Sequence, residues 1–283
     1  MSSVNGSNTV AAEILRLLRS AGVETAFGIP GVHNLAFWNA LDKQMPRIIS
    51  VRHEQSAVYA ADGLARATGG IGIAITTTGP GAANAIGAFG EASISKSPVL
   101  LIASEAPIRN RAIGKYRGFL HEMEDQSALF APLAKRLADG RVLANSASDA
   151  KEALNLIVEA IHHLRAAPTG SAYVGIPADI LNQELVTYNQ EITRSTDMTI
   201  DLKQTCELIK NSDRVVIWAG GGAIEFSGEI AGLADHLSAL ILTSFAGRGV
   251  ANESEGYLQL PIHEKEASDA LGSADLQIGR AHV

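Results

Sequence analysis

Apolar residues along the first half of the chain alternate between short continuous runs and helical spacing. The runs predict buried strands over residues 23–27, 47–51, 71–76, 98–103 and 171–176. The helical spacing predicts helices over 10–21, over 32–41, after 54, after 84 and from 149 onwards. Strands that alternate with helices are typical of a parallel sheet covered on both faces. The pattern therefore predicts an α/β fold with a doubly wound parallel sheet.

Capping residues stand at the ends of two predicted helices. Asn8 or Thr9 is a suitable N-cap for the first helix, and Gly22 is a suitable stop. Asp149 followed by Glu152 has the spacing of a capping box. These residues predict where both helices begin and where the first one ends.

A polar, non-periodic stretch separates this domain from a second α/β pattern. The second pattern predicts a helix over 202–210, a strand over 214–218, a helix to about 237 and a strand over 240–243. After residue 250 the pattern thins, and a strand begins at 275 just before the chain ends. We expect a first domain over 1–184, a linker over 185–199 and an incomplete, Rossmann-like second domain over 200–283.

Composition narrows the class of protein. The chain has 46% hydrophobic but only 5% aromatic residues, which suits alanine-rich α/β layers. Its formal charge of −7, without a basic run, argues against nucleic acid or anionic membranes as partners. The single cysteine, Cys206, and the lack of an apolar leader or membrane-length run favour a cytoplasmic protein.

Glu54 lies between a predicted strand and the alanine-rich helix that follows it. Ligands of open α/β sheets bind at the carboxyl ends of strands. The helix dipole holds a carboxylate there ionised, while burial pushes it towards neutrality. Glu54 is not part of a zinc-protease motif, because Ala57 stands where the second histidine is required. From spacing alone, a capping or salt-bridged role with Arg52 or Arg66 remains the alternative.

Two glycine turns follow predicted strands. Gly79-Pro80-Gly81 lacks the spacing and the lysine of a P-loop, so it either lets a flat ligand approach or is simply a tight turn. Gly220 to Gly222 does not spell the dinucleotide fingerprint, and the next strand ends in Thr-Ser rather than an acid. That triplet either faces a nucleotide or allows close packing. His33, His53 and His121 lie in loops, where a structural or rim role is the simplest interpretation of each.

Taken together and in order, these segments resemble a known family. FGIPG (27–31), RHEQSAVYAADGLARATG (52–69), TTTGPGAAN (76–84) and SPVLLIASEAP (97–107) resemble the pyrimidine-binding domain of thiamine-diphosphate-dependent enzymes, in the acetolactate synthase-like branch. VVIWAGGGA (215–223) and LILTSFAGRGV (240–250) resemble the central domain of that family. The resemblance extends over nearly the whole chain.

The resemblance implies roles for particular residues. Glu54 is expected to hydrogen-bond N1′ of the cofactor's aminopyrimidine and so to promote loss of the thiazolium C2 proton. The other residues expected at the cofactor are Pro30, Gly31, Thr78, Gly79, Pro80 and Asn84. Those expected near the substrate are His33, His121 and Glu122.

The resemblance also implies cofactors and partners. The family binds the diphosphate and Mg²⁺ through a GDG…N motif on a third domain, and no GDG occurs in this sequence. We therefore expect no metal ligand on this chain and expect it to be a fragment, a mis-terminated sequence or one half of a split enzyme. The resemblance allows FAD on the second domain. It implies a homodimer or homotetramer in the complete enzyme.

The expected activity is cleavage or joining of C–C bonds in 2-oxo acids. The paired histidines of pyruvate decarboxylases are missing, since Pro107-Ile108-Arg109 stands in their place, which favours the acetolactate synthase-like branch. The alternative is a non-catalytic half-site module that needs a partner chain with the diphosphate and Mg²⁺ domain. A nicotinamide-dependent dehydrogenase is a third and weaker hypothesis.

Overall fold

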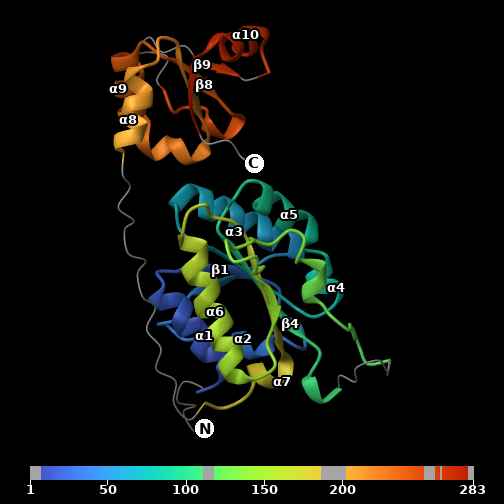
Figure 1. The fold of residues 1–283 in the computed structure, drawn as a ribbon. Coiled ribbons are helices and arrows are strands. Elements are labelled where there is room, and N and C mark those ends of the chain that lie inside the picture. The colour runs from blue at the N-terminus through green and yellow to red at the C-terminus, as the bar shows by residue number, and fades with distance from the viewer. Residues whose placement is uncertain (1–7, 111–117, 186–201, 252–258, 262, 280–283) are drawn as a thin grey trace. The chain divides into compact units, whose positions relative to one another are not determined.

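The computed structural model describes residues 8–110, 118–185, 202–251, 259–261 and 263–279 (Figure 1). The chain divides into two compact units, residues 1–196 and 197–283. The predicted linker over 185–199 falls almost entirely outside the described residues. Each unit has its own parallel sheet.

The first unit is built on a six-stranded sheet. Its order is β2-β1-β3-β4-β6-β5, and every neighbouring pair is parallel. β1 lies between β2 and β3, so the chain winds outwards in both directions from β1. This confirms the predicted doubly wound α/β fold. The strands are β1 (Thr25–Gly28), β2 (Arg47–Ser50), β3 (Gly72–Thr76), β4 (Val99–Glu105), β5 (Ala144–Ser146) and β6 (Ala172–Pro177).

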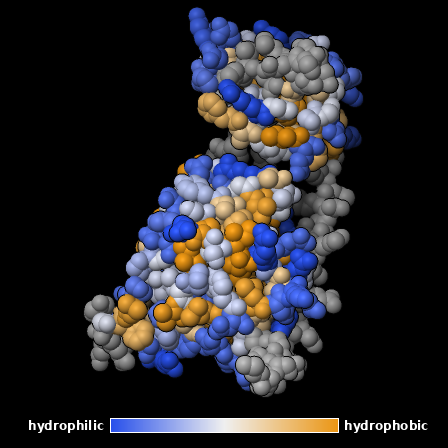
Figure 2. Space-filling model, turned by 180° about the vertical axis from the view of Figure 1, so that it is seen from behind, coloured by the Kyte–Doolittle hydropathy of each residue, from blue (hydrophilic) through white to orange (hydrophobic). Residues whose placement is uncertain are grey.

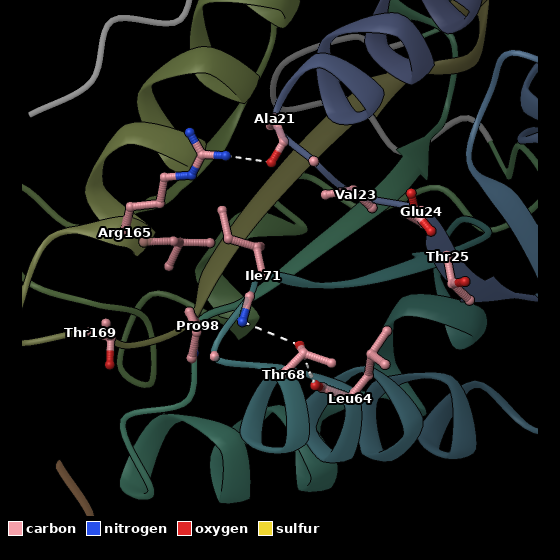
Figure 3. Close-up of a pocket in the computed structure, with 14 residues that line it drawn as sticks. Ala21, Val23, Glu24, Thr25, Leu64, Thr68, Ile71, Pro98, Arg165 and Thr169 are labelled. Atoms are coloured by element: carbon pink, nitrogen blue, oxygen red, sulfur yellow. Dashed lines mark hydrogen bonds between the residues drawn. The ribbon is translucent and has the colours of Figure 1, made fainter. Parts of the chain in front are cut away.

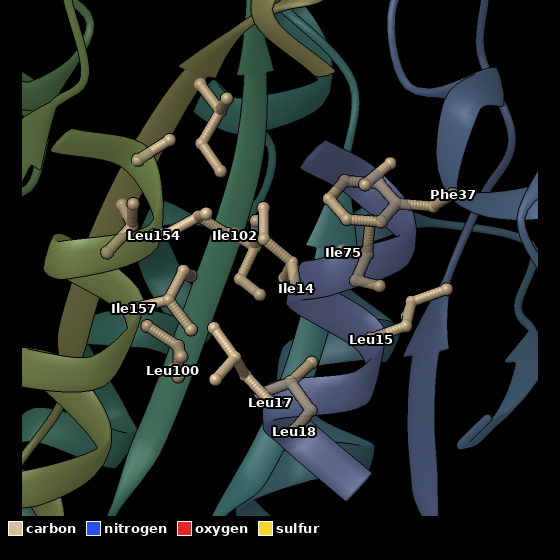
Figure 4. Packing of buried hydrophobic residues seen from close by; sticks show 14 of the residues in the cluster. Ile14, Leu15, Leu17, Leu18, Phe37, Ile75, Leu100, Ile102, Leu154 and Ile157 are labelled. Atoms are coloured by element: carbon tan, nitrogen blue, oxygen red, sulfur yellow. The ribbon is translucent and has the colours of Figure 1, made fainter. Parts of the chain in front are cut away.

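Helices cover both faces of this sheet. One layer, visible around α1 and α6 in Figure 1, packs on an aliphatic core that includes Ile14, Ile102 and Ile157 (Figure 4). The other layer packs on a core of alanines and three aromatic rings, in which Phe130 stacks on Tyr173 and meets Phe89 edge-to-face. The first layer comprises α1 (Val10–Ser20), α2 (Leu35–Asn39), α6 (Ala150–Arg165) and α7 (Ala178–Leu181), and the second α3 (Glu54–Thr68), α4 (Pro80–Ala83) and α5 (Ile86–Ile94).

The alanine face of α3 allows it to lie directly on the sheet. Ala57, Ala61 and Ala65 are buried. A Cβ on Gly72, at the start of β3, would come within 2.0 Å of the Ala61 carbonyl oxygen, so only glycine permits this approach. His53 caps the helix through Nδ1, which accepts from the Gln55 N–H. The helix start, and with it Glu54, is therefore fixed by packing and by a cap.

Several elements differ from the pattern-based expectation. β2 is an edge strand with Arg47 and Ser50 exposed, not a buried one. α2 is shorter than the predicted helix over 32–41, because residues 31–34 form a hydrogen-bonded turn instead. β5 was not predicted, since three residues are too few to show a period. In the predicted capping box Asp149 caps Glu152 N–H as expected, but the Glu152 side chain accepts from Ser148.

The beginning and the end of the first unit are joined by hydrogen bonds. Val10 N–H donates to the Gln183 carbonyl at 3.0 Å, and Leu185 N–H donates to the Asn8 carbonyl at 2.7 Å. Between them Thr9 and Glu184 form an isolated antiparallel bridge. Thr9 also caps α1 by accepting from Ala12 N–H, as predicted.

The second unit has a four-stranded parallel sheet in the order β10-β7-β8-β9. The predicted strands near 214–218, 240–243 and 275–279 are present, whereas β9 and α10 fall where the pattern had thinned. No described helix is long and apolar enough to cross a membrane. The elements are β7 (Val215–Ala219), β8 (Leu240–Thr243), β9 (Gln259–Pro261), β10 (Leu276–Gly279), α8 (Lys203–Lys210), α9 (Ser227–Leu237) and α10 (Lys265–Ser273).

Candidate functional site

Three loops meet at the carboxyl edge of the first sheet. They leave β2, β1 and β3, which are adjacent strands, and so lie side by side. The β2 loop leads to Glu54, the β1 loop contains Pro30 and Gly31, and the β3 loop contains Thr78 and Gly79. The topology therefore brings the predicted cofactor residues to one edge, where open α/β sheets bind ligands.

Glu54 is the first residue of α3 and contacts the end of α4. Its Oε2 accepts a hydrogen bond from Asn84 Nδ2 at 3.1 Å. Glu54 is partly exposed, not buried as predicted, and Asn84 beside it is exposed as well. Among the described residues Asn84 is its only hydrogen-bond partner, which leaves Oε1 able to accept from a ligand. The arrangement holds a carboxylate at a helix amino end with one oxygen open.

The Gly79-Pro80-Gly81 turn needs glycine at both ends. Gly79 has φ +62° and ψ −113°, a conformation that residues with a Cβ avoid, and it is the N-cap of α4. A Cβ on Gly81 would lie 2.6 Å from Thr77 Cγ2 and 3.4 Å from Glu54 Oε1. Pro80 is the first residue of α4, is exposed and fits the N1 position. The turn thus lets α4 pass close to Glu54.

Asn34 organises the neighbouring turn and was missed by the sequence analysis. Its buried side chain accepts from Gly31 N–H at 2.6 Å and donates to the Ile29 carbonyl at 3.0 Å. A Cβ on Gly31 would be 2.7 Å from Thr77 Oγ1, so Thr77 separates this turn from the Gly79-Pro80-Gly81 turn. An asparagine three residues after a turn glycine was the signal in the sequence. Pro30 itself is exposed at the tip.

His33 connects the two turns. Its Nδ1 is 2.8 Å from Thr78 Oγ1, which is in turn 3.2 Å from Ser104 Oγ at the end of β4. Partial burial lowers the pKa of His33 below its ordinary 6.5, and the nearby His121 lowers it further. The neutral imidazole is therefore favoured, with a ring that stacks on Phe119 at a centroid distance of 6.4 Å.

His121 and Glu122 lie on the segment that follows β4. His121 has a positive φ of 60°, and its Cβ is 2.7 Å from where a Cβ on Gly79 would stand. Glu122 accepts from the Phe119 N–H at 3.1 Å, so its carboxylate shapes the local turn. The structure brings His121 against the glycine turn and places His33 beside Phe119 of the same segment.

Beneath the edge lies a set of buried polar side chains that sequence reasoning did not find. Gln126 accepts from Gly79 N–H at 2.6 Å and donates to Tyr173 Oη at 2.9 Å. Tyr173 donates to Glu105, which also accepts from Ser146 Oγ at 2.6 Å. We call Gln126, Tyr173, Glu105 and Ser146 the Gln126 network.

A hollow of about 480 Å³ lies at the opposite edge of the first sheet (Figure 3). It opens among the amino ends of the strands, near Val23, Ile71 and Pro98. Arg165 reaches across it and donates to the carbonyl of Ala21, the C-cap of α1. Neither Glu54 nor a glycine turn of the candidate site lines this hollow, so it is separate from the proposed chemistry.

The glycine triplet of the second unit has a packing role. A Cβ on Gly221 would lie 3.1 Å from Ala246 Cβ, and one on Gly247 would lie 2.3 Å from the Ala219 carbonyl oxygen. These glycines allow the turns after β7 and β8 to touch, which favours the packing interpretation for Gly221. No heavy atom lies within 4 Å of a Cβ on Gly222, so that position is open.

Two family profiles match the chain, one on each unit. Residues 8–129 match the "Thiamine pyrophosphate enzyme, N-terminal TPP binding domain". Residues 202–279 match the "Thiamine pyrophosphate enzyme, central domain". The first match contains the three loops of the candidate site.

Curated relatives align with most of the chain. The probable 2-ketoarginine decarboxylase AruI of Pseudomonas aeruginosa is 33% identical over 86% of this chain and 43% of its own length. The probable acetolactate synthase large subunit of Methanocaldococcus jannaschii is 30% identical over 84% of this chain and 40% of its own length. The 2-hydroxyacyl-CoA lyase 2 of Danio rerio is 29% identical over 90% of this chain. The chain spans less than half the length of each of these relatives.

A solved structure shares the fold. It is that of a Mycobacterium smegmatis protein assigned as a thiamin diphosphate-dependent enzyme, with a TM-score of 0.76 and 21% identity. The match covers 96% of this chain and 52% of that one. The two profiles, the relatives and the parallel sheet agree with the resemblance carried by the HE and GPG segments. The chain belongs to the thiamine-pyrophosphate-dependent enzyme family, in its acetolactate synthase-like branch.

Proposed function

We propose that this chain supplies the pyrimidine-binding half of a thiamine diphosphate site in an enzyme that cleaves or joins C–C bonds of 2-oxo acids. The observation that carries the proposal is the Glu54 carboxylate, held by Asn84 beside two glycine turns. Relatives named as a 2-ketoarginine decarboxylase and an acetolactate synthase support the 2-oxo acid class.

The residues at the edge fit an aminopyrimidine ring. Glu54 Oε1 is open to accept from a protonated ring nitrogen, while Asn84 holds Oε2. A carboxylate within hydrogen-bond distance of a ring nitrogen can pass a proton to it or take one from it. When bound, the cofactor supplies the carbanion-stabilising chemistry. Glu54 then serves to hold and exchange one proton at the ring nitrogen.

The test is the Glu54→Gln variant of the full-length protein that contains this chain. The amide oxygen can still accept from Asn84, so packing is preserved, but the side chain can no longer exchange a proton. We expect turnover of a 2-oxo acid to fall by a factor of about 100 or more, the scale of a lost general acid–base group. Glu24→Gln, an exposed change at the opposite edge of the sheet, is the control and should keep full turnover. Undiminished turnover of Glu54→Gln refutes the role.

We propose further that the diphosphate and Mg²⁺ are held by residues outside this chain. The proposal is supported by the lack of a GDG segment in the sequence and by the length of the relatives. Calorimetry of the 283-residue chain with thiamine diphosphate and Mg²⁺ is the test. Weak binding that Mg²⁺ does not strengthen agrees with a half-site, whereas tight Mg²⁺-dependent binding contradicts it. The alternative, a half-site module that is non-catalytic by itself, predicts turnover only when a partner chain supplies the diphosphate and Mg²⁺ domain.

The complete enzyme is proposed to be a homodimer or homotetramer. Apolar side chains stay at the surface near the candidate site, with Val32 78% and Leu120 59% exposed. Figure 2 shows apolar patches on the first unit among polar surroundings. Sedimentation of the full-length protein tests this.

FAD on the second unit remains a proposal supported only by the open Gly222 position, and a flavin absorption spectrum of the purified protein would decide it.

A further inference from the structure

The hydrogen bonds of Gln126 have a fixed direction. Its side chain is 4% exposed, and its amide group lies between Gly79 N–H and two acceptors. Because a backbone N–H can only donate, the amide oxygen must face Gly79, at 2.6 Å. The amide nitrogen then donates to the Ser104 carbonyl at 3.1 Å and to Tyr173 Oη at 2.9 Å. Both ends of the amide are thus used inside the protein.

The rest of the Gln126 network anchors this amide to the centre of the sheet. Tyr173 on β6 is fully buried and donates to Glu105 Oε1 at 3.0 Å. Glu105 closes β4, is 2% exposed, and also accepts from Ser146 on β5. A Cβ on Gly175 would lie 2.0 Å from Glu105 Oε1, so the glycine in β6 makes room for the carboxylate. The network rests on three neighbouring strands and cannot shift without moving them.

Gly79 is the point where this network reaches the candidate site. It is the N-cap of α4, in a backbone conformation that only glycine adopts easily. α4 is a single turn, and its C-cap is Asn84, the residue that holds Glu54. A displacement of Gly79 therefore moves Asn84 and changes how the Glu54 carboxylate is held.

We infer that Gln126 is a positioning residue for the cofactor-binding edge, acting on Glu54 through Gly79, α4 and Asn84. This rests on the proposed function, since Glu54 is the group whose orientation matters. Gln126 touches neither Glu54 nor Asn84, and its effect is transmitted by the backbone of the glycine turn. The same amide also contributes to folding, so the test must separate positioning from stability.

Two variants of Gln126 make that separation. Gln126→Met is similar in length but offers no acceptor to Gly79, whereas Gln126→Glu keeps an oxygen for Gly79 and loses the donors to Ser104 and Tyr173. Both are expected to lower stability. Only Gln126→Met should free the Gly79 amide, raising its hydrogen-exchange rate in the 283-residue chain roughly tenfold or more, the scale of one lost buried hydrogen bond. A shift of the Asn84 side-chain NH₂ signals should accompany it.

A third variant covers the case in which Gln126→Met does not fold. Gln126→Asn keeps the amide but is one methylene shorter, so its oxygen cannot reach Gly79, and it should free the same amide. Ser127→Ala, a change next in sequence whose hydroxyl bonds Asp125, is the matched control and should leave Gly79 protected. Gln126→Met or, if that variant does not fold, Gln126→Asn is used for the comparison. An unchanged hydrogen-exchange rate of the Gly79 amide in that variant overturns the inference. If the Gly79 amide exchanges equally fast in Gln126→Met and Gln126→Glu, the inference is also overturned, because the loss of stability alone then explains the faster exchange.

Turnover of the full-length protein completes the test. Gln126→Met is expected to lower kcat about tenfold with little change in the KM for the 2-oxo acid, and Gln126→Glu is expected to lower kcat less. Unchanged kcat alongside a freed Gly79 overturns the functional half of the inference. Failure of the proposed function is recognised separately, since Glu54→Gln would then retain turnover while the exchange results at Gly79 stand.

Discussion

Removal of the Asn34 side chain should destabilise the first unit and loosen the turn that carries Pro30 and Gly31. The buried amide makes one bond as acceptor, at 2.6 Å, and one as donor, at 3.0 Å. Asn34→Ala leaves a backbone N–H and a carbonyl without these partners in a partly buried turn. At about 1–1.5 kcal/mol for each bond, the expected loss in the free energy of unfolding is about 2–3 kcal/mol.

The two tryptophans provide a specific assay. Trp38 lies on α2, just after the turn, whereas Trp218 lies in the second unit. In a Trp218→Phe background, urea unfolding followed by Trp38 fluorescence reports on the first unit alone, which matters because a chain of two units need not unfold in one step. Asn39→Ala, an exposed asparagine on the same helix, should stay within about 0.5 kcal/mol. A loss of less than that for Asn34→Ala would refute the reasoning.

Two further outcomes follow from groups near the same edge. The pKa of His33 is lowered from 6.5 mainly by burial and then by His121. The unfolded chain therefore binds more protons just below pH 6.5, and stability should fall as pH drops through 6.5. His33→Gln should remove this part of the pH slope, and an unchanged slope would contradict the assignment. Thr76 Oγ1 is buried and has no hydrogen-bond partner within the described part of the chain. Thr76→Val should therefore stabilise the first unit by about 1 kcal/mol in the Trp38 assay, whereas a lowered urea midpoint would show that the hydroxyl has a partner.

The sequence predicted the frame of the site because strands and helices leave periodic signals. The predicted run over 47–51 and the alanine face of α3 lie on either side of Glu54, so the sequence placed Glu54 at the end of a strand. The glycine turns were equally visible, since only a few residue types suit such turns. The sequence did not show how exposed Glu54 is, because the residue beside it, Asn84, is 30 positions away.

The residues of the Gln126 network could not be predicted from the sequence, for a different reason. Gln126 lies 47 residues from Gly79 and the same distance from Tyr173, in a segment without periodicity. A polar side chain in such a segment looks like surface until the fold closes over it. Glu105 carried a weak signal, as a carboxylate at the end of a strand that is apolar from Val99 to Ala103, yet its partners on β5 and β6 could not be inferred without the strand order.

Residues 8–10 and 183–185 pair through backbone hydrogen bonds, so the first and last described residues of the first unit are held together. The chain therefore enters and leaves the first unit at the same place. It can continue into the second sheet without crossing the first. A circular permutant that joins these ends and opens at an exposed loop should keep all six strands in order. Because its two ends are held together, the first unit can keep its six strands and the loops around Glu54 in place wherever it stands in a chain.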